Sequence, residues 1–122
     1  MKVLLSVKPE YAERIFSGEK QFEFRKCRFK KNISTVVVYV SSPIRRIVGE
    51  FEVDAVLEGP PSRLWQETAD KAGISKKLFF EYFLGKKIGI AIKIGKKEKY
   101  KRAINPYDSD KKFCPPQSFR YM

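Results

Sequence analysis

The sequence contains no histidine and only two cysteines, and both shortages restrict the chemistry that the chain can perform. Without histidine, the chain cannot use the usual histidine-based ribonuclease mechanism, the serine and cysteine triads, or a histidine-bound metal. Cys27 and Cys114 lie far apart, and neither has a second cysteine close to it. Because this spacing does not match that of metal ligands, we expect no zinc or iron centre and no cofactor.

The sequence also lacks long apolar runs. No stretch approaches the roughly 18 apolar residues that a membrane-spanning helix needs, and the N-terminal residues do not follow the secretory signal pattern. We therefore expect a cytoplasmic protein with reduced cysteines. A chain of 122 residues without linker, repeat or low-complexity segment is predicted to form one domain over residues 1–122.

Acidic residues are scarce, since 14 Asp and Glu face 26 Lys and Arg, and the net charge is +12. The excess is uneven: residues 1–31 carry +5, residues 32–85 carry −1, and residues 86–122 carry +8. A clustered basic surface on a small domain is typical of proteins that bind a polyanion. The alternative is a basic surface that serves only solubility.

The periodicity of apolar residues predicts an α+β fold. The run Thr35–Val40 is nearly all β-branched and should be buried on both faces, and Ile47–Leu57 alternates as a half-buried strand does. We expect Ile88, Ile90, Ile92 and Ile94 to face the core along the last strand. The other predicted elements are strands at Val3–Val7 and Phe22–Arg28 and helices at Pro9–Phe16, Ser62–Ala72 and Ser75–Leu84.

The segment Ser17–Arg25 is the most informative part of the chain. Gly18 fits the left-handed residue that ends a helix, and from Gln21 the pattern alternates with a period of two. Glu23 and Arg25 should therefore share one strand face, close to Lys20 on the preceding turn. The segment predicts a small polar pocket, although an ion network without a ligand is the alternative interpretation.

The pattern Gly18-x-Lys20-x-x-Glu23-x-Arg25 resembles the signature of the ASCH domain, a branch of the PUA-like superfamily. The resemblance extends to "MKVLLSVKPEYAERIFSGEK", "VVVYVSSPIRRIVGEFEV", "FFEYFLGKKIGIAIKI" and "PPQSFRYM". It implies a PUA-like mixed β-barrel with two to three helices packed around it. It also implies RNA or a modified nucleoside as the ligand, with DNA as a further option.

Three functions follow from this reading. The first is an RNA- or nucleotide-binding module with its pocket at the mouth of the barrel. The second is a small hydrolase in which Lys20 acts as base or nucleophile, Glu23 holds it or activates water, and Arg25 binds an oxyanion. The resemblance suggests acetylcytidine amidohydrolase or ribonuclease activity, with Glu23 where those amidohydrolases have threonine and Glu81 as a later carboxylate. The third is a transcription-associated adaptor.

Further basic and polar residues are candidates for contacts to nucleic acid. Lysines and arginines at the rim of a pocket would bind phosphates without reading sequence. Phe29, Tyr39, Trp65 and Tyr107 could stack on bases, although packing in the core is the alternative for each. The C-terminal segment either closes the sheet or reaches the pocket, and the oligomeric state is left open. The candidate nucleic-acid contacts are Lys20, Arg25, Lys26, Arg28, Lys30, Lys31, Ser41, Ser42, Arg45, Arg46, Gln117, Ser118 and Arg120.

Overall fold

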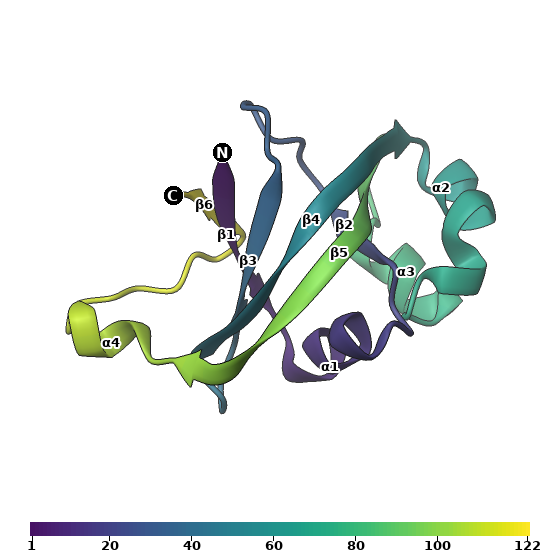
Figure 1. Ribbon diagram of the computed structural model, residues 1–122. Helices are drawn as coiled ribbons and strands as arrows, with labels where there is room; N and C mark the ends of the chain where they lie inside the picture. The colour runs from purple at the N-terminus through teal and green to yellow at the C-terminus, as the bar shows by residue number, and fades with distance from the viewer.

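A computed structural model describes all residues, 1–122, and shows six strands and a few short helices (Figure 1). The strands are β1 (Lys2–Val7), β2 (Phe22–Arg25), β3 (Thr35–Val40), β4 (Arg46–Gly59), β5 (Gly89–Ile104) and β6 (Phe119–Tyr121). The helices are α1 (Pro9–Ser17), α2 (Pro61–Thr68), the 3-10 turn η1 (Ala69–Lys71), α3 (Lys76–Tyr82) and α4 (Pro106–Ser109). The predicted α+β class is confirmed.

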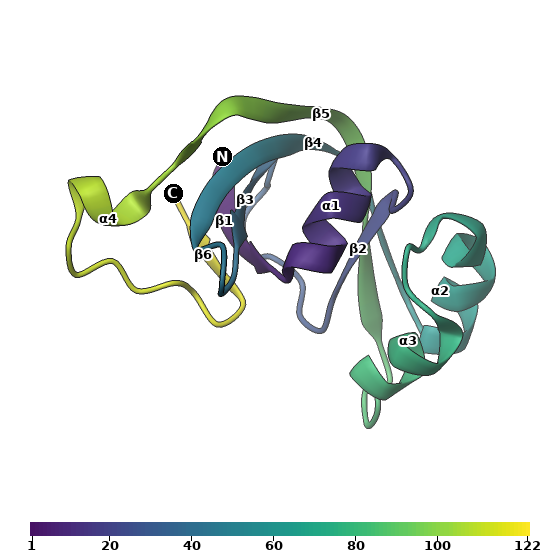
Figure 2. The same cartoon turned by 90° about the horizontal axis from the view of Figure 1, so that it is seen from below.

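The strands form one mixed sheet in the order β2-β5-β4-β3-β1-β6. Only β1 and β3 pair in parallel, and all other neighbours are antiparallel. The sheet curls into a half-barrel, and α1 lies on the inner side of its curve (Figure 2). This architecture agrees with the expected PUA-like barrel.

The core follows from the β-branched strands. Val36 to Val40 are all buried, as predicted for a strand covered on both faces, and Val3, Leu5 and Val7 of the paired β1 join them. Ile15 of α1 packs against this group from inside the curve. Phe119 and Tyr121 pack against it from β6, so the C-terminal segment does close the sheet.

A second apolar cluster joins α2 and α3 to the strands β2 and β5. Phe24 of β2 packs edge-on against Phe79 and Phe83, and Trp65 packs beside Phe79. Ser75 caps α3 by accepting a hydrogen bond from the Leu78 amide, as predicted. These helices form a lobe at one end of the sheet, next to β2 (Figure 2). The lobe matters for function because β2 carries the predicted pocket residues.

Several boundaries differ from the sequence predictions. Ile88 precedes β5 and is 47% exposed, so its assignment to the core is wrong. The strand β5 begins at Gly89 and runs to Ile104, and its lysine-rich half pairs with β4. The strand β2 ends at Arg25 rather than Arg28, the helix predicted at Ser62–Ala72 changes to a 3-10 turn at Ala69, and the short α4 was not predicted.

The ends of the chain lie side by side. The strand β6 pairs antiparallel with β1, and the Met122 amide donates a hydrogen bond to the carbonyl of Lys2 (Figure 1). None of the helices has the length and apolar character needed to cross a membrane.

Candidate functional site

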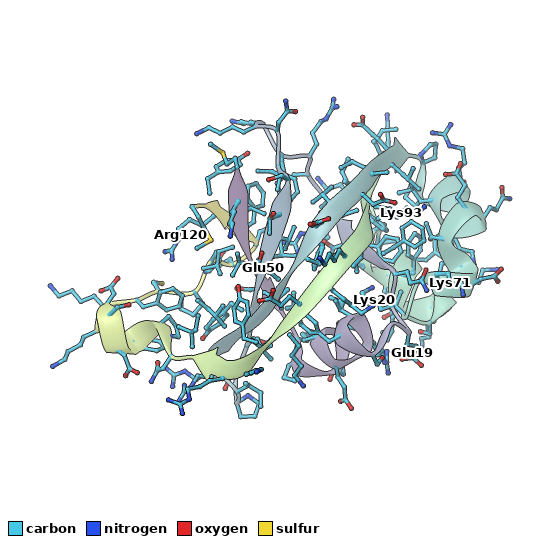
Figure 3. The ribbon with its side chains drawn as sticks, in the orientation of Figure 1. Glu19, Lys20, Glu50, Lys71, Lys93 and Arg120 are labelled. Atoms are coloured by element: carbon cyan, nitrogen blue, oxygen red, sulfur yellow. The ribbon has the colours of Figure 1, made fainter.

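Lys20 occupies the centre of the site and is buried. Gly18, with φ of 90°, ends α1 in the left-handed conformation and turns the chain inward. The Lys20 ammonium donates a hydrogen bond of 2.9 Å to the carbonyl of Ala72 and lies 4.7 Å from the centre of the Phe24 ring. The sequence predicts only partial desolvation of a turn lysine, but Lys20 is 2% exposed because the η1–α3 segment covers it. Figure 3 shows Lys20 between α1 and the helical lobe.

Gly73 makes this position available to Lys20. It has φ of +63°, and a Cβ atom at residue 73 would collide with the Lys20 side chain. A residue with a side chain would therefore be both strained in its backbone and obstructed by Lys20. The left-handed turn at Gly73 thus forms the back wall behind Lys20.

Glu23 provides a carboxylate next to this lysine. The distance from Glu23 Oε1 to Lys20 Nζ is 3.9 Å, and Glu23 is 7% exposed. Burial lowers the pKa of Lys20, while the charge of Glu23 opposes that effect and Arg14 adds to it. A buried ion pair therefore lies under the site, and its lysine gives up a proton more readily than an ordinary lysine.

Arg25 follows on the same face of β2 and is held by the C-terminal segment. Its Nη2 atom donates a hydrogen bond to Ser118 Oγ, whereas its Nε atom is buried and has no partner. Ser6 Oγ fastens the same segment by donating a hydrogen bond of 2.6 Å to the carbonyl of Pro116. The segment before β6 therefore positions the Arg25 guanidinium.

These side chains line an open cavity of about 420 Å³, here called the central cavity. The sequence-predicted trio of Lys20, Glu23 and Arg25 is brought together in it. Phe24 also lines the cavity, although it is 6% exposed and packs mainly in the lobe. The other lining residues are Ser6, Val7, Lys8, Tyr11, Ile74, Leu78, Glu81 and Tyr82.

A second cavity, of about 570 Å³, adjoins the first and is here called the adjacent cavity. Both cavities are lined by Ser6, Val7 and Lys8, so they lie next to each other, and the two together are here called the groove. The adjacent cavity contains no aspartate or glutamate, and hydroxyl groups and cations dominate its polar lining. Its remaining lining residues are Tyr39, Ser41, Ser42, Arg45, Tyr107, Pro115, Pro116 and Gln117.

Arg45 links two tyrosines in the adjacent cavity. It has φ of 56°, its guanidinium lies 5.1 Å from the centre of the Tyr107 ring, and it is close enough to Tyr39 and Tyr107 to influence the pKa of both. The hydrogen bond from Arg45 lowers the pKa of Tyr107. Burial raises the pKa of Tyr39, and the hydrogen bond with Tyr107 adds to that rise. Two neighbouring hydroxyls thus have pKa values shifted in opposite directions.

The other predicted contact residues lie around this groove or away from it. Lys26 lies 4.7 Å from the centre of the Tyr82 ring, at the rim of the central cavity. Arg28 pairs with Glu58, and Lys30 and Lys31 contact Tyr121. Arg46 donates to the carbonyl of Arg45. Arg120 lies outside both cavities, stacks on Phe113 and donates to the Cys114 carbonyl, and Figure 3 shows it far from Lys20.

Sequence reasoning missed several residues that line the groove. Ser6 and Lys8 flank the end of β1, at the junction of the two cavities, and Tyr11 and Tyr82 line the central cavity from α1 and α3. The signal for Tyr11 was available, because it lies on the apolar side of α1, two turns before Gly18. No comparable signal marks Lys8 or Tyr82, since their positions depend on how β1 and α3 pack. No group of three His, Cys, Asp or Glu side chains is arranged to hold a metal ion.

Comparisons with known proteins agree with this architecture. The crystal structure of ASCH from Zymomonas mobilis superimposes with a TM-score of 0.90 at 26% identity, over 99% of this chain and 87% of that chain. The ASCH domain-containing ribonuclease of Zymomonas mobilis is 26% identical over 99% of this chain and 84% of that protein. The N-terminal domain of Staphylothermus marinus McrB shares the fold at a TM-score of 0.52 and 14% identity.

A further relative is a much longer protein. The large ribosomal subunit protein uL22 of Ureaplasma parvum serovar 3 is 31% identical over 98% of this chain, which spans only 39% of that protein's length. The model of the ASCH domain family matches residues 5–113, which is most of the chain. On this match, together with the fold and the Gly18–Arg25 signature, the chain belongs to the ASCH domain family.

Proposed function

We propose that this protein binds single-stranded RNA, with one unpaired nucleotide in the central cavity and the adjoining phosphate in the adjacent cavity. The observation that carries the proposal is that the two cavities are neighbours, because Ser6, Val7 and Lys8 line both of them. One end of the groove offers a mixture of hydrogen-bond donors and acceptors, and the other end offers cations and hydroxyls. The two ends therefore complement the two parts of a nucleotide, since a base carries donors and acceptors and a phosphate carries negative charge.

The central cavity suits a base. Tyr11 and Tyr82 provide flat faces beside the polar floor of Lys20 and Glu23. Unpaired bases are recognised in this way, by stacking on aromatic side chains and hydrogen bonding along their edges. A paired base could not reach Glu23, which is 7% exposed at the floor. The proposal therefore requires a single-stranded segment.

The adjacent cavity and the loop after β2 suit phosphates. Arg45 and Lys8 line the cavity without any neighbouring carboxylate in its lining, and its serine and tyrosine hydroxyls are further donors. Lys26 adds positive charge at the rim on the Arg25 side, and Lys30 and Lys31 lie farther along the same loop, against Tyr121 of β6. Such contacts position a strand without reading its sequence.

The test is to reverse charge in the loop after β2. In the Lys30→Glu/Lys31→Glu variant, affinity for single-stranded RNA should fall by about tenfold or more at low salt, almost equally for all sequences. The matched control is Lys86→Glu/Lys87→Glu, which changes the net charge equally in the turn before β5, outside the loop after β2. Equal losses in the two variants would indicate a general charge effect. Failure of the unaltered protein to bind RNA at low salt would overturn the proposal.

A second candidate function is hydrolysis, favoured by the ribonuclease to which the chain is similar over 99% of its length. The lowered pKa of Lys20 suits it to accept a proton, and Glu23 lies beside it. Glu81 lines the same cavity, where a later carboxylate for acetylcytidine hydrolysis is expected. Incubation with RNA or acetylcytidine, analysed for products, tests both reactions. Turnover that the Glu23→Gln substitution abolishes supports an enzyme, whereas RNA binding without turnover supports a binding module that has no catalytic activity.

A further inference from the structure

We propose that the central cavity selects guanine over the other bases by binding its Watson–Crick edge with Glu23 and Arg25. This inference rests on the proposed function, since it names the base that the RNA-binding groove accepts. It follows from two groups in the cavity whose hydrogen-bonding capacity the protein itself leaves unused.

The first group is the Glu23 carboxylate. Its nearest positive charge, Lys20 Nζ, lies 3.9 Å away, which is beyond hydrogen-bonding distance, and that ammonium donates to the carbonyl of Ala72 instead. No protein group donates a hydrogen bond to the carboxylate, although Glu23 is 7% exposed. The carboxylate lines the open cavity, where water can donate to it, and the N–H groups of a ligand can replace that water. Glu23 is therefore an acceptor for N–H groups of a ligand.

The second group is Arg25 Nε, which is buried and has no partner. The guanidinium cannot swing freely, because its Nη2 atom is bound to Ser118 Oγ. Glu23 and Arg25 are two residues apart on one face of β2 and line the same cavity. The cavity is thus lined by a carboxylate acceptor and a guanidinium donor from neighbouring positions on one strand face.

Guanine matches this pair better than any other common base. Its edge places two neighbouring donors, N1–H and the 2-amino group, next to the acceptor O6. A carboxylate can accept from both donors while a guanidinium donates to O6. Adenine and cytosine place an unprotonated ring nitrogen beside their amino group, and uracil flanks its one N–H with two carbonyls. In these three bases a lone pair would face the carboxylate.

The walls of the cavity support a bound purine. Burial raises the pKa of both Tyr11 and Tyr82, and the negative charge of Glu23 contributes to both rises. The Glu23 carboxylate therefore lies close enough to both tyrosine hydroxyls to raise their pKa values, and the charge of Arg25 lowers the pKa of Tyr82. Tyr82 lines the same cavity as Glu23 and Arg25, so a base bound to these two residues would lie beside Tyr82, whose ring centre is also 4.7 Å from Lys26 Nζ.

The experiment compares short oligouridines that carry one central guanosine, inosine, adenosine or cytidine, with affinity measured by fluorescence anisotropy. We expect guanosine to bind about tenfold more tightly than adenosine or cytidine, because each of these leaves the buried carboxylate poorly satisfied. Inosine lacks only the 2-amino group and should fall between them. In Glu23→Gln the preference should be lost, whereas Lys30→Glu/Lys31→Glu should weaken all four equally.

Arg25→Lys provides a second variant should Glu23→Gln fail to fold. It keeps the positive charge and removes the planar guanidinium with its set of donors, so the preference for guanosine should fall while the dependence of affinity on salt stays unchanged. Equal affinity of the unaltered protein for all four oligonucleotides would overturn the selection of guanine and leave RNA binding intact. A preference for cytidine or adenosine would also overturn it. Binding of none of them would overturn the proposed function as well.

Discussion

The two halves of the groove are built in different ways. The central cavity is lined from strand β2 and helices α1 and α3, and its floor is a buried Lys20–Glu23 ion pair backed by Gly73. The adjacent cavity is lined mainly from the turn after β3 and from residues 107–117, and its key cation, Arg45, is exposed. Regular elements thus surround one half, whereas loops surround most of the other.

This difference in construction matches a difference in chemistry. The Lys20 and Glu23 charges at the floor of the central cavity are opposite in sign and buried, so their interactions are strong and depend on geometry. Charges in the adjacent cavity are positive and exposed to solvent, so they attract anions over a distance that salt shortens. We infer that the first half provides selectivity and the second provides general affinity. The predictions below address this division.

The largest expected effect is on folding, at the central cavity. Lys20→Met should lower the free energy of unfolding by about 3 to 5 kcal/mol, because it leaves the Glu23 carboxylate buried without its cation. The double variant Lys20→Met/Glu23→Gln should recover much of that loss. Urea denaturation of the three proteins measures both effects. If the double variant is as unstable as the single one, Glu23 does not depend on Lys20, and the buried ion pair has no energetic role.

A smaller effect on binding is expected at the adjacent cavity. Arg45→Met should reduce RNA affinity by about tenfold and make the plot of log affinity against log salt shallower by about one unit, because one phosphate contact is lost. The melting temperature should change little, since Arg45 is exposed. Affinity measured over a salt series tests this, with Arg63→Met in α2 as a control outside both cavities. An unchanged salt dependence would show that Arg45 binds no phosphate.

The smallest expected effect depends on pH. Arg45 lowers the pKa of Tyr107, so Tyr107 loses its proton and becomes negatively charged at a lower pH than an ordinary tyrosine. The phenolate would repel phosphate, so RNA affinity should fall as the pH rises toward about 10. Tyr107→Phe should show a weaker decline over the same range, by a fewfold. Parallel declines in the two proteins would mean that Tyr107 does not face the bound phosphate.

The sequence predicts local features of this fold well. The β-branched run Thr35–Val40, the helix end at Gly18 and the Ser75 cap depend on neighbouring residues, and all three are present. The features that were missed depend on distant parts of the chain. The strand β2 stops at Arg25, where its pairing with β5 ends, and Ile88 is exposed because it precedes the sheet. Neither fact is encoded in the local pattern.

The same distinction between features set by neighbouring residues and features set by distant segments applies to the candidate site. The signature brings Lys20, Glu23 and Arg25 together over six residues, so alternation along one strand was enough to predict their proximity. The contact of Arg45 with Tyr39 and Tyr107 brings distant segments together, and the fastening of Arg25 by Ser118 needs β6 to lie beside β1. The burial of Lys20 was underestimated because the covering segment, with Ala72 and Gly73, is remote in sequence.

The pairing of β1 with β6 has a mechanical consequence. The two chain ends lie at the same end of an antiparallel pair, so a pull between them would load the inter-strand hydrogen bonds one after another, as in a zipper. The strand β6 has only three residues, so it would peel off under a force that leaves the buried strands intact. The segment that holds Arg25 through Ser118 would be released with it. Tension on the ends of the domain would thus free the Arg25 side chain in the groove before it disrupts the core.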